Sequence, residues 1–522
     1  MSTPFDSVHA EAETPQNAKA ALLRHKRYAP LFWGAFAFIL IVAVWSRLYD
    51  LNVPFDRVGY DEGVYWQSLR AMSAGQGLYS TIFYSQPPVF LLSIFPTFVL
   101  FGQSLWSARF GIALISLFGF LGAYLLGRSL SGRFGALVAL LLLLLNPLYL
   151  AESQTIQAEG PSVALTLLAI GFAFLWWQQP DGRRGTCWAS LAGITVALSI
   201  FSKLLSVPTI VPLILLVIAR SWQIWRKYPG TNAHSWLPVG AGVGLALLTS
   251  LVVVLPFLST FQNFWASVVS FHEITVQDIP VVYSSNEVLQ PVLFSFLSAT
   301  AIYGTLIALL RKDWRALPLL AWLLVTLILL LRQYPLYPHH TVALIPPFIA
   351  LAVLSVARPG SYKTIPVNSK RRRKAVALFS TVLPISLVLL TTGFNMVQDV
   401  RYYLDTNINS TSVNTQQALR AANDLRQAIA PDQWVVTDGQ FVAGLADRST
   451  PPSLVDTSNV RISTGYVTLK QLEQSASDPR VHAVLFFTYR FDLPNINRFH
   501  AWVAQRFHLI HTYGPGQELW VR

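Results

Sequence analysis

Residues 24–50 read RHKRYAPLFWGAFAFILIVAVWSRLYD, and in this stretch a basic cluster directly precedes an apolar run from 30 to 48. An α-helix needs about 20 apolar residues to cross a bilayer, and basic residues collect on the cytosolic side. A long polar stretch precedes the basic cluster, which is not the pattern of a cleavable export signal. The sequence therefore predicts a cytosolic polar tail over 1–29 that leads into a retained first membrane helix.

The whole chain has the composition of a polytopic membrane protein. Of its 522 residues, 53% are hydrophobic and only 12% are charged, and the mean hydropathy is +0.46. A soluble domain carries roughly 25% charged residues, so a water-soluble globule is excluded. A net charge of +13 would suggest nucleic acid in a soluble protein, but here the basic residues lie mainly in short loops between apolar runs. We therefore expect no nucleic-acid partner. The single cysteine, Cys187, excludes an internal disulfide framework.

The apolar runs indicate about 11 to 13 transmembrane helices, with eleven full spans as the favoured count. The runs are 30–48, 87–102, 105–127, 134–150, 161–177, 187–201, 204–219, 237–258, 291–310, 316–331, 340–357 and 375–396. Run 87–102 is short and contains three prolines, so we predict a re-entrant or interfacial segment there. With that choice the strongly basic loops all lie on the cytosolic side, namely 19–27, 128–133, 183–184, 220–227, 311–315 and 358–374. A break at Lys203 leaves the count open.

An odd number of spans places the end of the chain outside the cell. From about residue 401 the apolar residues come in short runs that alternate with helix-like stretches, which predicts a small soluble α/β domain over 401–522. The transmembrane domain then covers 30–400, and its first outer loop, 49–86, is long.

The first outer loop carries a pair of acids. Residues 55–88 read FDRVGYDEGVYWQSLRAMSAGQGLYSTIFYSQPP, and apolar residues at helical spacing follow Asp61 and Glu62. This pattern predicts a short amphipathic helix on the outer membrane surface. Two interpretations of the acids stay open at this point. They cap and begin that helix, or a partly desolvated carboxylate takes a proton from a hydroxyl nucleophile.

Two further outer segments carry polar residues. Residues 146–162, NPLYLAESQTIQAEGPS, contain Glu152 and Glu159, which either bind a divalent cation or an acceptor or are simply hydrated at helix ends. Residues 332–347, RQYPLYPHHTVALIPP, place cations beside aromatic residues, which suits a lipid phosphate but is also typical of an interfacial aromatic belt. The candidate phosphate-binding residues in this segment are Arg332, Tyr337, His339 and His340.

Together these motifs resemble the membrane-embedded C-type glycosyltransferases, and the family 39 type most closely. The features shared are DEGxYW in a long first outer loop, the later QPP that opens an apolar run, the loop at Gly127-Arg128, the acidic outer loop and the Tyr-Pro motif. Protein O-mannosyltransferases and the lipid A aminoarabinose transferase are of this type. The resemblance covers roughly residues 30–400 and does not extend to the C-terminal domain.

The resemblance implies the C-type glycosyltransferase fold and an inverting transfer of a sugar, a hexose or a pentose, from a polyprenyl-phosphate donor. The acceptor would be a hydroxyl on a lipid, glycan or protein of the cell envelope, at the outer face of the plasma membrane. Asp61 matches the catalytic aspartate of the family, Glu159 or alternatively Glu152 matches the second-loop acid, and Tyr337 with its histidines would stabilise the leaving phosphate.

The metal site of the aminoarabinose transferases is not reproduced in the sequence. Those enzymes have a Glu-Lys pair just before the proline, where this chain has Ser85 and Gln86. His272 aligns with the family's other metal ligand, but one ligand does not make a site. A divalent cation stays a candidate cofactor, and we expect weak or absent metal dependence. Complete loss of activity in metal-stripped enzyme would contradict this expectation.

Two other classes of function fit parts of the pattern. A transporter or flippase of lipid-linked saccharides would show paired half-repeats and charges buried at the membrane midplane. Here the acids lie in outer loops, which favours chemistry over transport. A catalytically inactive member whose C-terminal domain binds an envelope polymer is the third possibility.

Overall fold

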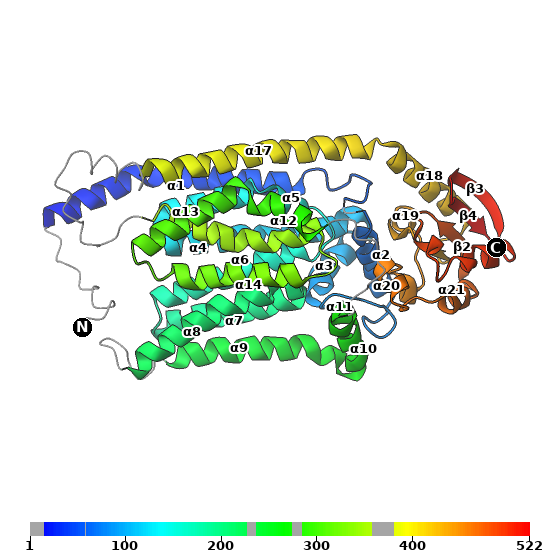
Figure 1. Cartoon of the computed structure of the whole chain (residues 1–522), viewed down its shortest axis with the longest axis horizontal. Coiled ribbons are helices and arrows are strands. Elements are labelled where there is room, and N and C mark those ends of the chain that lie inside the picture. Colours follow the sequence, from blue (N-terminus) through cyan, green and yellow to red (C-terminus); the bar gives the residue numbers. More distant parts are fainter. Residues whose placement is uncertain (1–14, 58, 227–235, 274–283, 358–380) are drawn as a thin grey trace.

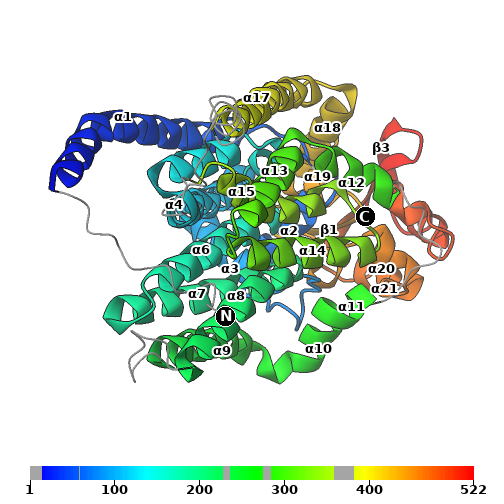
Figure 2. The ribbon, with the colours of Figure 1, turned by 60° about the vertical axis from the view of Figure 1, so that its left-hand side comes forward.

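The protein is a bundle of long helices that carries a small sheet domain at one end (Figure 1). The computed structural model describes residues 15–57, 59–226, 236–273, 284–357 and 381–522. The long helices are α1 (Pro15–Leu48), α4 (Leu105–Leu144), α6 (Glu159–Gln178), α7 (Gly182–Ser202), α8 (Ile210–Trp225), α9 (Trp236–Val254), α13 (Phe296–Leu310), α14 (Ala316–Arg332), α15 (Ile345–Leu354) and α17 (Leu383–Ser410). In both views α17 and α9 lie at opposite edges of the bundle (Figures 1 and 2).

Each apolar run predicted from the sequence contains a helix in the structure, but the helices differ in length. Within the described ranges, seven are long and apolar enough to cross a membrane, or eight when α12 (Ser285–Leu293) and α13, bent by 63°, form one span. Runs 105–127 and 134–150 share the label α4 but are two helices, because the backbone is non-helical at Ser131 and Gly132 and the chain reverses there. A Cβ atom on Gly127 would lie 2.4 Å from the Gly135 carbonyl oxygen. Run 87–102 forms only the 12-residue α3 (Val89–Leu100). The chain is a multi-pass membrane protein, and several of the predicted spans are short or broken helices.

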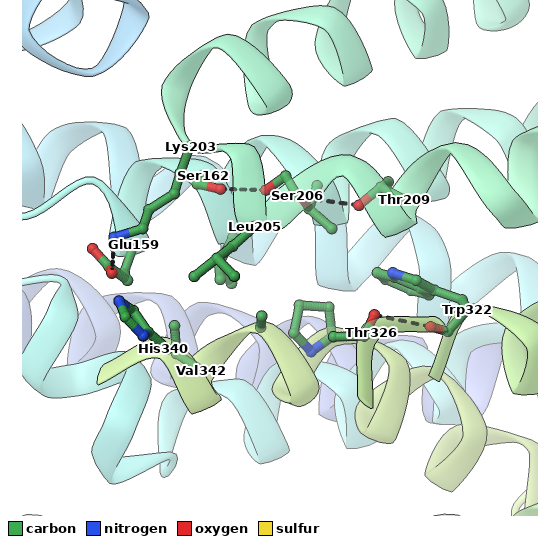
Figure 3. Close-up of a pocket in the computed structure, with 14 residues that line it drawn as sticks. Glu159, Ser162, Lys203, Leu205, Ser206, Thr209, Trp322, Thr326, His340 and Val342 are labelled. Carbon is green, nitrogen blue, oxygen red and sulfur yellow. Dashed lines mark hydrogen bonds and ion pairs between the residues drawn. The ribbon is translucent and has the colours of Figure 1, made fainter. Parts of the chain in front are cut away.

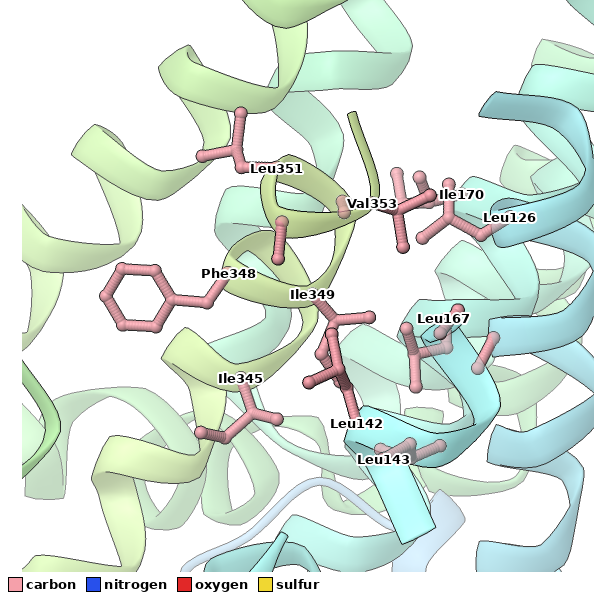
Figure 4. Close-up of a cluster of buried hydrophobic side chains, with 14 of the residues drawn as sticks. Leu126, Leu142, Leu143, Leu167, Ile170, Ile345, Phe348, Ile349, Leu351 and Val353 are labelled. Atoms are coloured by element: carbon pink, nitrogen blue, oxygen red, sulfur yellow. The ribbon is translucent and has the colours of Figure 1, made fainter. Parts of the chain in front are cut away.

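Small residues allow the central helices to approach closely. A Cβ atom on Gly122 of α4 would lie 2.5 Å from the backbone of α6, and one on Gly304 of α13 would lie 2.0 Å from the Leu351 carbonyl oxygen of α15. Without a hydrophobic driving force between helices in lipid, such close packing holds a bundle together. Leu126, Leu167 and Ile349 meet where α4, α6 and α15 converge (Figure 4). By contrast, the most apolar window of the Trp236–Glu273 span buries none of its residues, which is expected of a helix that faces lipid.

The C-terminal domain is a small α/β unit, as predicted. Its sheet has the order β1-β2-β4-β3, in which β1 and β2 are parallel and the other pairs are antiparallel. The strands are β1 (Trp434–Thr437), β2 (Val481–Phe486), β3 (His508–Gly514) and β4 (Gln517–Val521). The helices are α18 (Val413–Ala428), α19 (Gln440–Leu445), α20 (Asn459–Ser463), α21 (Leu469–Ala476) and α22 (Arg498–Ala504). α17 runs from the bundle through residue 401 to Ser410 without interruption.

The first outer loop contains the predicted helix, α2 (Asp61–Ser73), but the helix does not lie open on a membrane surface. Residues 62–71 of α2 are all buried, and α19 of the C-terminal domain packs against Gly63, Trp66 and Gln67. The side chain of Gln67 donates to the Arg448 carbonyl oxygen at 3.0 Å and accepts from the Thr450 amide at 3.2 Å. The expectation of a surface helix is therefore wrong, because a domain far along the chain supplies the second partner.

The contact between α2 and α19 depends on a glycine in each helix. A Cβ atom on Gly63 would lie 2.4 Å from the Phe441 backbone nitrogen, and one on Gly444 would lie 2.5 Å from the Trp66 ring. Backbone atoms cannot move aside as a flexible side chain can. The C-terminal domain is therefore seated directly on the helix that begins with Asp61.

Gly63→Ala is expected to lower the free energy of unfolding by roughly 1–3 kcal/mol, because the added methyl group overpacks this contact. Thermal unfolding followed by tryptophan fluorescence would measure the change. Gly393→Ala is the matched control, since Gly393 is also helical and has no heavy atom within 4 Å of its Cβ position. Equal melting temperatures for the two variants would contradict the prediction.

Candidate active site

Asp61 begins α2 with its carboxylate free of any capping role. The N-cap residue is Tyr60, and no side chain caps the helix. Among the described residues, one hydrogen bond reaches the Asp61 side chain, from Gln157 Nε2 at 3.4 Å from Oδ2. Burial raises the pKa of Asp61 to about 6, against the lowering effect of Lys203 and with a further raising effect of Glu159. Asp61 therefore has the pKa of a proton acceptor that works near neutral pH.

Glu62, the next residue, forms a buried ion pair in which both of its carboxylate oxygens accept hydrogen bonds. Both it and Arg109 of α4 have 0% side-chain exposure. Arg109 donates from Nε to Oε1 at 2.7 Å and from Nη2 to Oε2 at 2.6 Å, and the amides of Arg57 and Ile156 also donate to the carboxylate at 3.1 Å. Burial alone would raise the pKa of Glu62, but Arg109 outweighs it and holds this pKa below the ordinary value. Glu62 thus joins two outer loops to α4.

Glu159, at the start of α6, forms a second charged cluster. Lys203 Nζ contacts Glu159 Oε1, and His339 Nε2 lies 3.6 Å from the same oxygen. Lys203 has extended backbone angles at the break between α7 and η1 (Leu204–Thr209). The break that the sequence suggested at Lys203 therefore exists, and it turns the ammonium group toward Glu159. Figure 3 shows Lys203, Glu159 and His340 at one end of a cavity.

That cavity begins at the charged cluster and extends between the helices of the bundle. It is lined by hydroxyl groups as well as apolar side chains, and its volume of about 20 Å³ has room for a water molecule. The Ser162 and Ser206 hydroxyls contact each other, and the Thr166 and Ser199 hydroxyls lie 2.7 Å apart. The lining hydroxyls belong to Ser162, Thr166, Ser206, Thr209 and Thr326.

Glu152, the alternative second-loop acid, is buried at the end of α5 (Pro147–Glu152). Its Oε2 atom has no hydrogen-bond partner among the described residues. Burial raises its pKa well above the ordinary value, and the nearby Glu159 charge adds to the shift. Of the two acids in this loop, Glu159 is the one held in an ion pair.

The third predicted segment divides into two parts. Tyr337 is half-buried, and its ring stacks on His339 with 5.6 Å between centroids. Burial raises the pKa of Tyr337, the Asp61 charge raises it further, and Arg490 lowers it, so these three groups share one environment. His340 Nδ1 lies 3.3 Å from the Tyr337 amide. Arg332 is exposed at the end of α14, and no interaction given by the structure joins it to Asp61.

The metal-ligand candidates are distributed over two places. Donor atoms of Glu159, His339 and His340 lie within 4.8 Å of one another. The Lys203 ammonium is already in contact with the Glu159 carboxylate, so a fixed positive charge balances this cluster. His272 lies apart, in α11 (Phe271–Glu273), where its Nε2 is 2.7 Å from the Ser85 carbonyl oxygen. The Lys203 ammonium competes with a cation for the Glu159 carboxylate, and weak or absent metal dependence stays a prediction.

Two groups of site residues were missed by the sequence analysis. The sequence marked Lys203 only as a break between two apolar runs, and its pairing with Glu159 depends on how α7 ends. Asp456 and Arg490 come from the C-terminal domain, and both change the pKa of Asp61. Their sequence neighbourhood contains no recognisable motif, so only the seating of that domain on α2 reveals them.

The fold and these outer loops define a membrane protein with the C-type glycosyltransferase fold, and the resemblance predicted from the motifs is confirmed. The family model for dolichyl-phosphate-mannose-protein mannosyltransferase matches residues 85–259. No curated protein sequence matches the chain.

Solved structures give the particular relatives. The chain is similar to ArnT from Cupriavidus metallidurans in the apo state, with a TM-score of 0.63, 15% identity, and coverage of 95% of this chain and 98% of ArnT. ArnT bound to undecaprenyl phosphate gives the same TM-score at 16% identity, with 93% and 98% covered. The oligosaccharyltransferase of Archaeoglobus fulgidus gives 0.51 at 15% identity, with 88% and 70% covered. At these identities the likeness establishes the fold.

Proposed function

We propose that the protein is an inverting glycosyltransferase that moves a sugar from a polyprenyl-phosphate donor to a hydroxyl acceptor at the outer face of the plasma membrane. The observation that carries the proposal is the Asp61 carboxylate, which does not cap α2 and is therefore available for chemistry. Charged and polar groups near it include Tyr337, Lys203 and Glu159. The similarity to ArnT, which has been solved with undecaprenyl phosphate, supports the choice of donor class. The acceptor is a lipid, glycan or protein hydroxyl.

In the proposed reaction Asp61 takes the proton of the acceptor hydroxyl. The acceptor oxygen forms a bond to the anomeric carbon while the bond from that carbon to the phosphate oxygen breaks, so its electron pair leaves with the phosphate. The products are the glycoside, with inverted configuration, and the polyprenyl phosphate. Positive and hydrogen-bonding groups that face the phosphate stabilise the charge it gains, and such stabilisation is commonly a large contribution to catalysis.

The membrane orientation follows as part of the proposal. In Figure 1 the first residues of α1 lie at one end of the bundle, and α2 and the C-terminal domain lie at the other. With the basic tail in the cytosol, Asp61 and residues 401–522 face outward. Residues accessible to a membrane-impermeant label on intact cells would then include the C-terminal domain.

The position of the buried charges favours chemistry over transport. Glu62 precedes the membrane core, Glu159 begins α6, and Lys203 follows the end of α7, so these charges gather at one end of the bundle. A transporter would be expected to place its paired charges near the midplane. The described residues therefore support a reaction at one membrane face.

The rate should depend on the ionisation of Asp61. A base acts only when it is deprotonated, so a pKa raised to about 6 moves the loss of activity upward from the acidic range of an ordinary aspartate. We expect kcat/KM to fall about tenfold per pH unit below about pH 6 and to be level just above it. Steady-state rates between pH 4.5 and 8 would test this, and a level profile down to pH 4.5 would contradict it.

The direct test of the function is to incubate the purified protein with a panel of polyprenyl-phosphate sugars, including hexoses and pentoses, and to measure the release of polyprenyl phosphate. Heat-inactivated protein is the control for spontaneous hydrolysis. Consumption of at least one donor is expected, and consumption of none would contradict the proposal.

A further inference from the structure

The C-terminal domain presents one tightly held loop toward the first outer loop. Residues 487–490 follow β2, at the carboxyl end of the parallel pair β1 and β2, where ligand sites of parallel sheets commonly lie. Asp438, at the end of β1, accepts from the Phe487 amide at 2.7 Å and from the Arg490 amide at 2.9 Å. The Thr488 hydroxyl donates to the Asp438 carbonyl oxygen at 2.7 Å. The loop therefore holds Arg490 in a fixed place.

The backbone of this loop supports the same conclusion. Tyr489 has a φ of 62°, in the left-handed region that bulky residues rarely adopt. Such a conformation persists only where its surroundings impose it, and it often marks a place where a side chain must be aimed. Here it immediately precedes Arg490.

The guanidinium group of Arg490 is held but not paired. Its central carbon lies 3.7 Å from the centroid of the Tyr60 ring, and Tyr60 directly precedes Asp61. The Arg490 Nε atom is buried without a hydrogen-bond partner, and no hydrogen bond or ion pair of this side chain occurs among the described residues. A guanidinium has five N–H donors, so Arg490 keeps its capacity to bind an anion.

Four other cations near the candidate site already have partners. Lys203 pairs with Glu159, and Arg109 pairs with Glu62. Arg57 donates to the Gln154 and Tyr402 side chains, both at 2.9 Å. Arg461 donates to the carbonyl oxygens of Ser453 and Asp456. Arg490 differs from all four, because its guanidinium has no such partner among the described residues.

Arg490 is also close enough to act on the candidate active site. Its charge lowers the pKa of both Asp61 and Tyr337, which come from two other parts of the chain. Asp61 is the proposed base, and Tyr337 is the residue that the resemblance assigns to stabilising the departing phosphate. Arg490 is therefore a cation within electrostatic reach of both groups, and it stacks on the residue that directly precedes the proposed base.

We propose that Arg490 binds the phosphate of the polyprenyl-phosphate donor, so that the C-terminal domain contributes a substrate-binding residue to the active site. The assignment rests on the proposed function. A planar guanidinium matches phosphate oxygens in a bidentate manner, and its stacking on Tyr60 keeps the fork oriented. The phosphate gains negative charge as the bond to the sugar breaks, so this contact would strengthen during the reaction.

The test is the binding of undecaprenyl phosphate to the full-length protein in detergent micelles, measured by thermophoresis. Arg490→Gln should weaken binding roughly 10- to 100-fold, as expected for the loss of hydrogen bonds to a charged group. Arg490→Lys should recover part of the affinity, because it keeps the charge but loses the fork. Undecaprenol, which lacks the phosphate, should bind the wild type and Arg490→Gln equally.

Arg480→Gln is the matched control. Arg480 also lies over an aromatic ring, 3.7 Å from the centroid of Trp434, but it precedes β2 and so lies at the opposite end of that strand. This variant should bind undecaprenyl phosphate like the wild type, and melting temperatures of all variants would be recorded beside the affinities.

Each outcome distinguishes the assignment from the function on which it rests. Wild-type protein that binds no undecaprenyl phosphate would overturn both. Wild-type protein that binds it, with Arg490→Gln binding equally well, would overturn the assignment alone. A loss that Arg480→Gln shares, or that also appears with undecaprenol, would likewise overturn the assignment, because phosphate recognition would not be its cause.

Discussion

Asp61→Asn is expected to lower kcat by about 10²–10⁴-fold, the usual contribution of a positioned general base. Asparagine has nearly the same shape and keeps the contact with Gln157, but it cannot accept a proton at neutral pH. The helix should be unaffected, because Asp61 does not cap α2. Product formation under donor saturation would measure the change, and undecaprenyl phosphate binding would be recorded in parallel.

The expected pattern is a loss of turnover with donor binding preserved. Asp447→Asn is the control, since Asp447 is also an aspartate near α2 but pairs at the surface with Arg70, with 68% of its side chain exposed. Exposed pairs contribute at most about 1 kcal/mol, so this variant should turn over normally. Undiminished turnover in Asp61→Asn would exclude Asp61 as the base and would favour the transporter hypothesis.

The membrane part of the fold was predictable because its signal is local. A run of apolar residues must form hydrogen bonds within itself in lipid, so each run becomes a helix whatever its neighbours are. The exact spans were less predictable. The chain reversal at Ser131 and Gly132 keeps 105–127 and 134–150 as separate helices, whereas the bend between α12 and α13 depends on packing.

The candidate site was predictable only in part, for a related reason. Asp61, Glu159 and Tyr337 lie in three outer segments that topology alone brings to one end of the bundle. The distinction between Asp61 and Glu62 could not be read from the sequence, because it depends on Arg109, which lies in α4. The burial of α2 and the position of Arg490 depend on a domain that follows the last membrane helix.

Glu62→Gln is expected to destabilise the protein by about 3–5 kcal/mol, the usual cost of removing one partner from a buried ion pair. The variant leaves the Arg109 charge without its counterion, and both side chains have 0% exposure. Arg109 also donates to the Val53 and Phe55 carbonyl oxygens, at 2.7 and 2.9 Å, so the first outer loop should loosen with it. Thermal unfolding in detergent micelles would measure the loss.

Asp478→Asn provides the contrast, because its pair with Arg480 is solvent-accessible and should contribute at most about 1 kcal/mol. Combining Glu62→Leu with Arg109→Met should restore part of the stability, since replacing both partners of a buried pair leaves no uncompensated charge. Variants of the two neighbouring acids should then differ clearly in stability and turnover. Glu62→Gln loses folding and turnover together, whereas Asp61→Asn loses turnover with an unchanged melting temperature. A stable Glu62→Gln variant with selectively lost turnover would instead place Glu62 in the reaction. A purely structural ion pair could not be broken without a loss of stability.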